Sequence, residues 1–294
     1  MRVFAPAKVN LALHVTGRRG DGYHLLDSLV VFAGVGDWLD VERAETSRLT
    51  VTGPFAEGVP AGPENLIWKA HGLFADAPPL HVTLEKHLPH AAGIGGGSSD
   101  AAALLRVLSG PFGCAPRDTP ALLSLGADVP VCLSDRPQRM SGIGETVAPV
   151  PALPPLDLVL VNPGVSVPTG RVFKTLRSTN GAPLDAMAWG CRVGDPLDGF
   201  LAWLTAQRND LEAPARAIAP EIQDTLDALS ATEGCRLARM SGSGATCFGL
   251  FDGRRPDLAR DAAARIASAY PLWWVQAAPV LQAGHAVPMP PGSA

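Results

Sequence analysis

The chain has 294 residues, of which 47% are hydrophobic and 18% are charged, and its net charge at pH 7 is −4. These values are typical of a globular protein of about two domains, and they exclude the overall basic surface of a nucleic-acid-binding protein. We expect a cytoplasmic protein with reduced thiols, because no apolar run reaches the roughly 20 residues of a membrane span, the N-terminus lacks an apolar leader, and the five cysteines form no Cys-x-x-Cys pair.

The first part of the chain is predicted to be rich in strands. Hydrophobic alternation over residues 8–15 predicts a strand that buries valines and leucines on one face and presents Lys8 and Asn10 side by side on the other. A glycine-rich turn at 17–22 leads into a second extended run that starts at Tyr23 and His24 and continues to Phe32. Further strands are expected at 37–42, 48–52 and 81–86, with an amphipathic helix at 65–74.

The most distinctive stretch lies between the strand at 81–86 and an alanine- and leucine-rich helix at 101–108. It contains four glycines within positions 93–97, followed by the hydroxyls of Ser98 and Ser99. A helix N-terminus presents unpaired N–H groups and a partial positive charge, so this stretch is predicted to bind the phosphates of a nucleotide. It matches neither the dinucleotide fingerprint nor the P-loop. The local alternative is a flexible connection in which Ser98 or Ser99 caps the helix.

The rest of the chain divides at a proline-rich linker over 149–155. Before the linker we expect a helix at 118–125, a brief strand at 131–133 and a tight turn at 142–145. After it we expect strands at 156–161, 236–240, 246–251 and 272–275, and helices at 172–176, 197–207, 222–229 and 259–269. The pattern predicts an N-terminal domain over 1–152, a C-terminal domain over 153–284 and a flexible tail over 285–294.

Eight motifs along the chain resemble those of the GHMP kinase superfamily, in the same order. The glycine-rich stretch resembles the second superfamily motif, residues 5–11 the first and residues 241–245 the third. Within the superfamily the chain is similar to the kinases that phosphorylate a cytidine-diphosphate-linked methylerythritol. The segments that carry this similarity are 6–11, 21–24, 85–89, 97–102, 126–130, 168–169, 209–212 and 240–245. One departure is the segment 134–139, which is polar where a small, glycine-bearing turn is expected.

The resemblance implies a fold of the α+β (mixed α/β) class. It would be a two-domain GHMP kinase fold, with an N-terminal ribosomal-protein-S5-domain-2-like domain, a C-terminal ferredoxin-like domain and the active site in the cleft between them. It also implies transfer of the γ-phosphate of ATP, with Mg²⁺, to the 2-hydroxyl of 4-diphosphocytidyl-2-C-methyl-D-erythritol, on the non-mevalonate route to isoprenoid precursors. The expected partner is that small molecule, with no nucleic acid and no membrane, and the chain is expected to be a monomer or a weak homodimer.

Two residues are implied in catalysis by the resemblance. Asp128 would accept the proton of the attacking hydroxyl, with Lys8 beside it. A lysine keeps a nearby aspartate ionised, and its ammonium can stabilise the charge of the transferred group. Taken alone, Lys8 fits a solvated charge at a strand edge, and Asp128 fits the N-cap of a turn before Pro130.

The resemblance also implies a substrate-binding set of Asn10, Tyr23, His24, Thr169, Phe173, Ser241 and Gly242. Tyr23 and His24 would contact the cytosine, with Phe173 as the opposite wall, because stacking together with edge hydrogen bonds recognises a base. The alternatives from the residues alone are core packing for Phe173, a helix cap for Thr169 and an ordinary polar position on the sheet for Asn10.

The predicted ATP-binding set is Asn65, Lys86, Pro89, Ala91, Ala92, Gly93, Ile94, Gly95, Gly96, Gly97, Ser98 and Ser99. Asn65 and Lys86 are assigned to the adenine side by resemblance, and a solvated strand-end charge is the alternative for Lys86. Asp100 is an anion one turn into a phosphate-binding helix. It either complements the helix dipole or helps to hold Mg²⁺, and no metal ligand is assigned.

Other functions of the same fold stay open at this point. They are a kinase for mevalonate, homoserine or a sugar, a decarboxylase, and a nucleotide-binding regulator without turnover. The Tyr23–His24 pair argues against the first group, because those substrates carry no base to stack. The presence of both Lys8 and Asp128 argues against the regulator.

Overall fold

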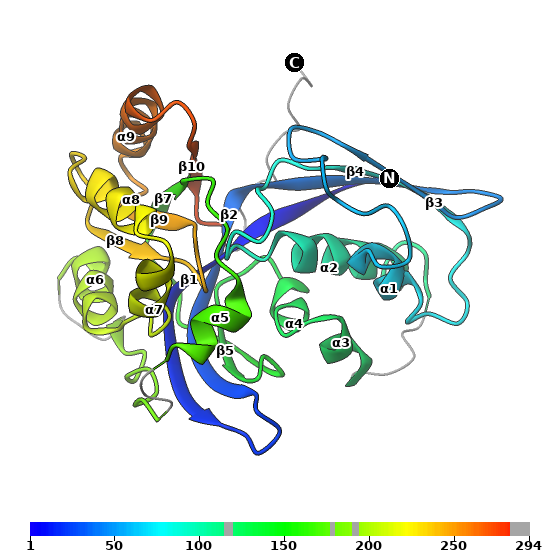
Figure 1. Ribbon diagram of the computed structural model, residues 1–294, viewed down its shortest axis with the longest axis horizontal. Coiled ribbons are helices and arrows are strands. Elements are labelled where there is room, and N and C mark those ends of the chain that lie inside the picture. The colour runs from blue at the N-terminus through cyan, green and yellow to red at the C-terminus, as the bar shows by residue number, and fades with distance from the viewer. Residues whose placement is uncertain (115–119, 177–179, 190–193, 283–294) are drawn as a thin grey trace.

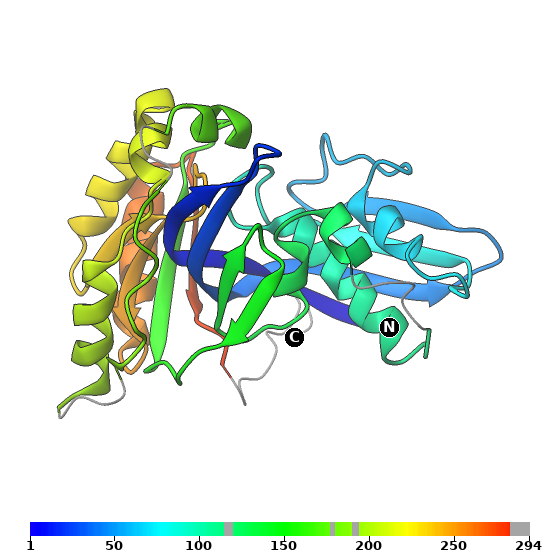
Figure 2. The ribbon, with the colours of Figure 1, turned by 90° about the horizontal axis from the view of Figure 1, so that it is seen from below.

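The computed structural model of the protein describes residues 1–114, 120–176, 180–189 and 194–282, which form two β-sheets with helices on their faces (Figures 1 and 2). Within these residues the first sheet has six strands in the order β3-β4-β2-β5-β6, with β1 paired to β2. Its strands are β1 (Arg2–Arg18), β2 (His24–Arg43), β3 (Arg48–Thr52), β4 (Leu80–Glu85), β5 (Gln138–Gly142) and β6 (Thr146–Pro149).

A long, bent hairpin of β1 and β2 forms the centre of this sheet. The extended run that starts at Tyr23 and the strand predicted at 37–42 are one continuous strand, β2. The pairing register shifts where Ala7 faces Ala33 and Pro6 faces Gly36. A Cβ at Gly36 would lie 2.2 Å from the carbonyl oxygen of Ala5, so only glycine permits this close approach. The glycines therefore bend the strand without ending it.

Four helices accompany the first sheet in the described residues: α1 (Leu66–His71), α2 (Gly96–Ser109), α3 (Pro120–Leu125) and α4 (Val129–Cys132). The prediction of a strand at 131–133 was wrong, because these residues lie in and directly after α4. A short apolar run fits a buried helix as well as a strand, and Pro130 suits the first turn of a helix. α2 begins at Gly96, five residues earlier than predicted, and residues 118 and 119 of the predicted helix at 118–125 lie outside the described residues.

The second sheet is antiparallel and has four strands in the order β10-β7-β9-β8 within the described part of the chain. Its strands are β7 (Leu156–Asn162), β8 (Leu237–Met240), β9 (Cys247–Asp252) and β10 (Trp274–Pro279). The helices of this half are α5 (Thr169–Lys174), α6 (Pro196–Ala206), α7 (Glu212–Ile218), α8 (Glu221–Ser230) and α9 (Pro256–Ala269). Of the linker predicted over 149–155, Pro149 is the last residue of β6, and residues 150–155 contain no helix or strand. The tail predicted over 285–294 lies outside the described residues.

The two sheets share a hydrophobic core. One face of the second sheet packs against α8 and α9, and the other packs against α6 and against residues of β1 and β2. Both faces of β1 are buried: Lys8 and Asn10, predicted on its polar face, are 3% and 0% exposed. Of the helices in the described ranges, none is both long and apolar enough to cross a membrane.

Candidate active site

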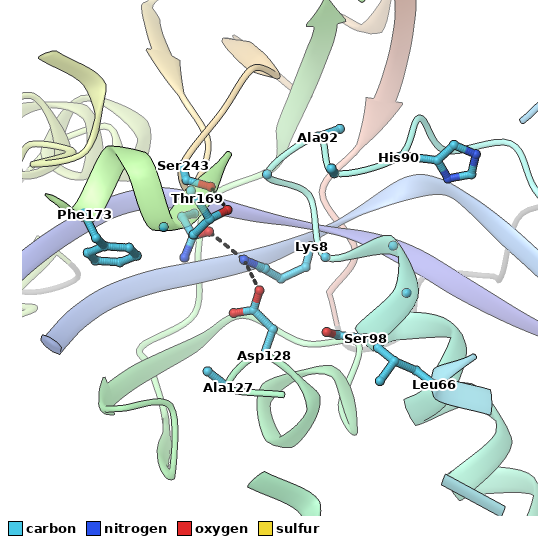
Figure 3. A pocket seen from close by; sticks show the side chains of 18 of the residues that line it. Lys8, Leu66, His90, Ala92, Ser98, Ala127, Asp128, Thr169, Phe173 and Ser243 are labelled. Carbon is cyan, nitrogen blue, oxygen red and sulfur yellow. Dashed lines mark hydrogen bonds and ion pairs between the residues drawn. The ribbon is translucent and has the colours of Figure 1, made fainter. Parts of the chain in front are cut away.

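A cavity of about 1190 Å³ lies between the glycine-rich segment, the β1–β2 hairpin and α5 (Figure 3). It brings together most of the residues predicted for catalysis, nucleotide binding and acceptor binding. Those on its wall are Lys8, Asn10, Tyr23, His24, Asn65, Lys86, Pro89, Ala91, Ala92, Gly93, Gly95, Gly96, Gly97, Ser98, Asp128, Thr169, Phe173 and Gly242. Ile94, Ser99 and Ser241 are instead buried behind the wall, at 1%, 0% and 0% exposure.

The N-terminus of α2 opens onto this cavity. Gly95 is its N-cap in the left-handed conformation, with φ of 63°, and no side chain caps the helix. The capping alternative was therefore wrong, because Ser98 and Ser99 lie inside the helix. Gly96, Gly97 and Ser98 form the first turn and line the cavity. Their N–H groups have no partner within the helix, so an anion is the natural occupant of this end of the cavity.

The two glycine-rich loops interlock behind the N-terminus of α2. The Ser241 hydroxyl donates to the carbonyl oxygen of Gly93 at 3.0 Å and accepts from the Asn10 backbone N–H at 3.1 Å. A Cβ at Gly93 would lie 2.5 Å from the carbonyl oxygen of Ser241, and Gly93 has φ of +75°. Glycine is thus required by both space and backbone conformation at this crossing. Ser241 holds the two loops together rather than lining the cavity.

Lys8 and Asp128 meet at the centre of the cavity wall (Figure 3). Lys8 Nζ lies 3.0 Å from Asp128 Oδ2 and donates to Asn10 Oδ1 at 2.8 Å. The Lys8 side chain is 4% exposed, so its reading as a solvated charge was wrong. Asp128 is the N-cap residue of α4, but its side chain makes no capping hydrogen bond. Its carboxylate is directed at Lys8 instead.

Ser28 fixes the orientation of Asn10, and sequence reasoning missed it. The Asn10 amide Nδ2 donates to Ser28 Oγ at 2.8 Å, and Ser28 Oγ donates to the carbonyl oxygen of Ala12 at 2.7 Å. This chain of hydrogen bonds leaves the amide oxygen of Asn10 to receive the Lys8 ammonium. Lys8 is therefore positioned by an uncharged group on its own strand as well as by Asp128.

Lys86 lies below the first turn of α2, and two carboxylates surround it. Its ammonium donates to Asp100 Oδ2 at 2.8 Å and also to Asp37 Oδ2. The Lys86 and Asp100 side chains are each 5% exposed and that of Asp37 is 0% exposed, so the solvated alternative for Lys86 was wrong. Although burial works against its charged form, the Asp100 and Asp37 carboxylates raise the pKa of Lys86. Asp37 was not predicted, but a buried lysine signals a nearby acid.

Aromatic rings occupy the end of the cavity nearest the hairpin turn. The rings of His24 and Phe173 stack, with centroids 4.8 Å apart and planes at 23°. Burial, with a contribution from the nearby Arg18 guanidinium, lowers the pKa of His24, so the ring is neutral at pH 7. Tyr23 is 61% exposed. A base inserted between two rings needs a separation of about 7 Å, or two stacking distances, so His24 or Phe173 must move to admit one.

Thr169 and Asn65 lie at opposite ends of the cavity. Thr169 Oγ1 lies 2.8 Å from Ser243 Oγ, which ties the start of α5 to the second glycine-rich loop. Ser243 lines the cavity and was not predicted. Asn65 caps α1: its Oδ1 accepts from the Ile67 N–H at 2.9 Å, while its Nδ2 donates to the carbonyl oxygen of Pro60 at 2.7 Å. The amide of Asn65 is thus largely engaged within the protein.

Comparison with known proteins agrees with this geometry. The family described as "GHMP kinases N terminal domain" matches residues 65–136, and "GHMP kinases C terminal" matches residues 197–271. A protein of Jannaschia sp. (strain CCS1) named 4-diphosphocytidyl-2-C-methyl-D-erythritol kinase is 55% identical, over 96% of this chain and 98% of its own. One of the same name from Dinoroseobacter shibae is 57% identical, over 92% of each chain. The chain belongs to the 4-diphosphocytidyl-2-C-methyl-D-erythritol kinase family. A crystal structure of 4-(cytidine 5'-diphospho)-2C-methyl-D-erythritol kinase superposes with a TM-score of 0.76 at 36% identity, covering 95% of this chain and 99% of that one.

Residues 209–212, one of the motifs shared with this kinase family, hold the backbone of the loop that begins after Met240. Asn209 Nδ2 donates to the carbonyl oxygens of Met240 and Gly242, at 2.8 and 2.9 Å. Glu212 Oε2 accepts from the Met240 N–H at 2.9 Å. The sequence indicated the motif but not its role, because the loop that it holds is about thirty residues further along the chain.

The polar segment 134–139 that departs from the family pattern also has a structural role in this kinase-family chain. Arg139 donates from Nε to Asp27 Oδ1 at 2.7 Å and from Nη2 to the other carboxylate oxygen. Asp27 is buried and also accepts from the Leu184 N–H at 2.9 Å. The departure therefore places an arginine that joins β5, β2 and the segment after residue 180. It does not disturb the Lys8–Asp128 pair.

Proposed function

We propose that this chain transfers the γ-phosphate of ATP to the 2-hydroxyl of 4-diphosphocytidyl-2-C-methyl-D-erythritol, giving the 2-phosphate and ADP. The observation that carries the proposal is the Lys8–Asp128 pair, which lies on one cavity wall together with the open N-terminus of α2. Donor phosphates at α2 and an acceptor hydroxyl at Asp128 would share that cavity. Positioning of the two reactants is the main requirement of phosphoryl transfer.

The donor half of the reaction is assigned to α2 and the loop before it. The N–H groups of Gly96 and Gly97 and the helix dipole would hold the phosphates without any charged side chain of the loop. Ser98 would add a hydroxyl from the same turn. Asn65, the N-cap residue of α1, lines the cavity and would lie toward the adenine. Lys86, which also lines the cavity beside this turn, would lie on the same side.

The acceptor half is assigned to Asp128 and Lys8. Asp128 would accept the proton of the attacking 2-hydroxyl as its bond to phosphorus forms. Lys8 would keep that carboxylate ionised and stabilise negative charge on the transferring group. The Asn10 amide oxygen accepts from the Lys8 ammonium at 2.8 Å. The Lys8 charge is therefore already positioned when the reactants bind.

Recognition of the acceptor is assigned to the aromatic end of the cavity. Tyr23, which is exposed, would close on the cytosine from one side, with Phe173 on the other. His24 would leave its stack on Phe173 and present a neutral ring nitrogen to the base edge. Thr169 and Gly242 would line the path between the cytidine and the reacting hydroxyl.

Mg²⁺ is included in the proposal as the counter-ion of the ATP phosphates. The described residues contain no group of three or more His, Cys, Asp or Glu side chains that could hold a metal ion. Mg²⁺ often keeps several waters and binds through substrate phosphates, so the ATP phosphates themselves would supply most of the ion's ligands other than water here. When bound, the ion neutralises charge on the phosphates.

We propose that the chain acts in the cytoplasm as a monomer or a weak homodimer, without nucleic acid or membrane. Cys114, Cys132, Cys235 and Cys247 are free thiols, which suits a reducing compartment.

The test is ADP release from ATP by the purified chain, measured with and without 4-diphosphocytidyl-2-C-methyl-D-erythritol. We expect release to depend on that acceptor, and methylerythritol without the cytidine, mevalonate and homoserine to be poor acceptors. Release that no acceptor stimulates would contradict a kinase. Equal rates with acceptors that lack cytidine would contradict the assigned substrate.

A further inference from the structure

A cluster of three buried charged groups lies directly against the first residue of α2. A Cβ at Gly96 would be 3.4 Å from Lys86 Nζ and 3.6 Å from Asp37 Oδ2. Asp100 lies one helical turn further on and completes the cluster through its 2.8 Å contact with Lys86. The cluster therefore lies immediately beneath the backbone that would receive the nucleotide phosphates.

The charges of this cluster do not balance if both carboxylates are ionised. Two carboxylates and one ammonium would leave one negative charge buried under an anion-binding site, and such pairs of acids hold a shared proton. Asp37 has partners on both oxygens, because its Oδ1 accepts from the N–H groups of His87 and Leu88 at 2.6 and 2.9 Å and its Oδ2 accepts from Lys86. Asp100 Oδ1 is buried and has no partner among the described residues. Asp100 is therefore the member of the cluster that gains or loses the proton.

The electrostatic surroundings agree with this assignment. Burial, together with the neighbouring Asp37 carboxylate, raises the pKa of Asp100 to about 8, against the opposing effect of Lys86. The other titratable or charged groups on the elements packed around α2 are engaged elsewhere or stay in one form. Lys8 of β1 is paired with Asp128, the N-cap residue of α4, and burial raises the pKa of Cys132 of α4 to about 12. Arg106 of α2 donates to two backbone carbonyls, and His71 of α1 is hydrogen-bonded to the Pro78 carbonyl oxygen. Lys69 of α1 is exposed.

We propose that the Asp37–Lys86–Asp100 cluster couples nucleotide binding to proton binding. Asp100 takes up a proton from solvent when nucleotide phosphates bind at the first turn of α2. This inference rests on the proposed function, which assigns the phosphates to that turn. Negative charge arriving one turn from Asp100 disfavours its ionised form, so nucleotide and proton strengthen each other's binding. As the pH rises through the pKa of the free enzyme, Asp100 ionises and nucleotide affinity falls.

The test is titration calorimetry with ADP at constant Mg²⁺ between pH 7.5 and 9.5, where the ADP phosphates are already ionised. At pH 8.5 it is repeated in two buffers of different ionisation enthalpy, which measures proton uptake directly. For the unmodified chain we expect uptake of a fraction of a proton. We also expect a Kd that rises up to about tenfold across the range, which is the change that follows if nucleotide raises the pKa of Asp100 by about one. Thermal melts confirm that each variant is folded.

Two variants of nearly identical shape separate this linkage from a purely structural role. Asp100→Asn keeps the hydrogen-bonding oxygen and removes the titration, so we expect no proton uptake and a pH-independent Kd close to the low-pH value of the unmodified chain. Asp37→Asn leaves one carboxylate beside Lys86, so Asp100 ionises. We expect no uptake there either, but weaker ADP binding at every pH.

An ADP affinity of the unmodified chain that does not depend on pH, proton uptake that persists in Asp100→Asn, or equal affinity of the two variants would each overturn the inference. Failure of the unmodified chain to bind ADP at any pH would instead count against the proposed function, and the inference would fall with it.

Discussion

Replacement of Asp128 by asparagine tests the catalytic assignment with the smallest possible change in shape. The variant keeps an oxygen that can face Lys8 Nζ, now 3.0 Å from Asp128 Oδ2. It loses the negative charge and the ability to accept a proton. Lys8 remains bonded to Asn10 Oδ1 at 2.8 Å, so the ammonium does not lose its position.

The expected effect on catalysis is larger than the effect on stability. Loss of a general base lowers kcat by about 10²–10⁴-fold, which corresponds to about 3–5 kcal/mol of transition-state stabilisation. The Asp128 side chain is 32% exposed, but that of Lys8 is 4% exposed, so the variant leaves a buried ammonium with one partner fewer and should lose about 1–3 kcal/mol of folding free energy. A nearly inactive enzyme that is still folded, with a melting temperature lowered by a few degrees, is therefore predicted.

The assay is ADP release under saturating ATP and acceptor, with ADP binding measured separately. The control is Asp135→Asn, which removes the same charge from an exposed position in the same region and should retain nearly full activity. We expect Asp128→Asn to bind ADP within a few-fold of the unmodified chain. If its kcat stayed within tenfold of normal, Asp128 would not be the base, and the proton of the acceptor would have to leave by another route.

Three further outcomes test the residues that support the site. Gly93→Ala would place a methyl group 2.5 Å from the Ser241 carbonyl oxygen, at a residue with φ of +75°. We therefore expect thermal unfolding to show a loss of about 1–3 kcal/mol of folding free energy. The control is Gly20→Ala, whose added Cβ meets nothing within 4 Å and which should lose none. Asn209→Asp replaces the amide that donates to the Met240 and Gly242 carbonyl oxygens by a group that can only accept. Urea unfolding should therefore show a loss of about 2–4 kcal/mol of folding free energy, and an unchanged urea midpoint would refute this role of Asn209. Burial lowers the pKa of His14 below its ordinary 6.5, so its contribution to stability is complete above pH 6.5 and is lost as the pH falls toward the folded-state value; urea midpoints of His14→Gln should depend less on pH over that range.

The parts of the site that could be predicted depend on local chemistry. The glycines at 93–97 and the hydroxyl residues after them predict a helix start open to an anion, and α2 begins there. The alternation around Lys8 predicts that Lys8 and Asn10 share a face, and their side chains are hydrogen-bonded. In both cases the relevant atoms lie within a few residues of one another, so backbone geometry alone brings them together.

The parts that could not be predicted depend on distant segments. Lys86 was assigned as a nucleotide contact or a solvated charge, yet its partner Asp37 lies 49 residues away in the sequence. The strand predicted at 131–133 is in α4 because a short apolar run is equally suited to either structure. Neither the carboxylate beside Lys86 nor the helical form of residues 131 and 132 could be inferred from neighbouring residues.

By itself, the sequence determined which reactive groups the protein carries, their order and the local backbone forms that glycine, proline and alternation impose. The tertiary structure decided which of those groups are buried, which of them meet, and which only hold others in place. Ser241 became a tie between two loops and Asp100 a member of a buried charge cluster. The physical reason is that conformational preference acts over a few residues, whereas burial and charge pairing depend on every segment that packs nearby.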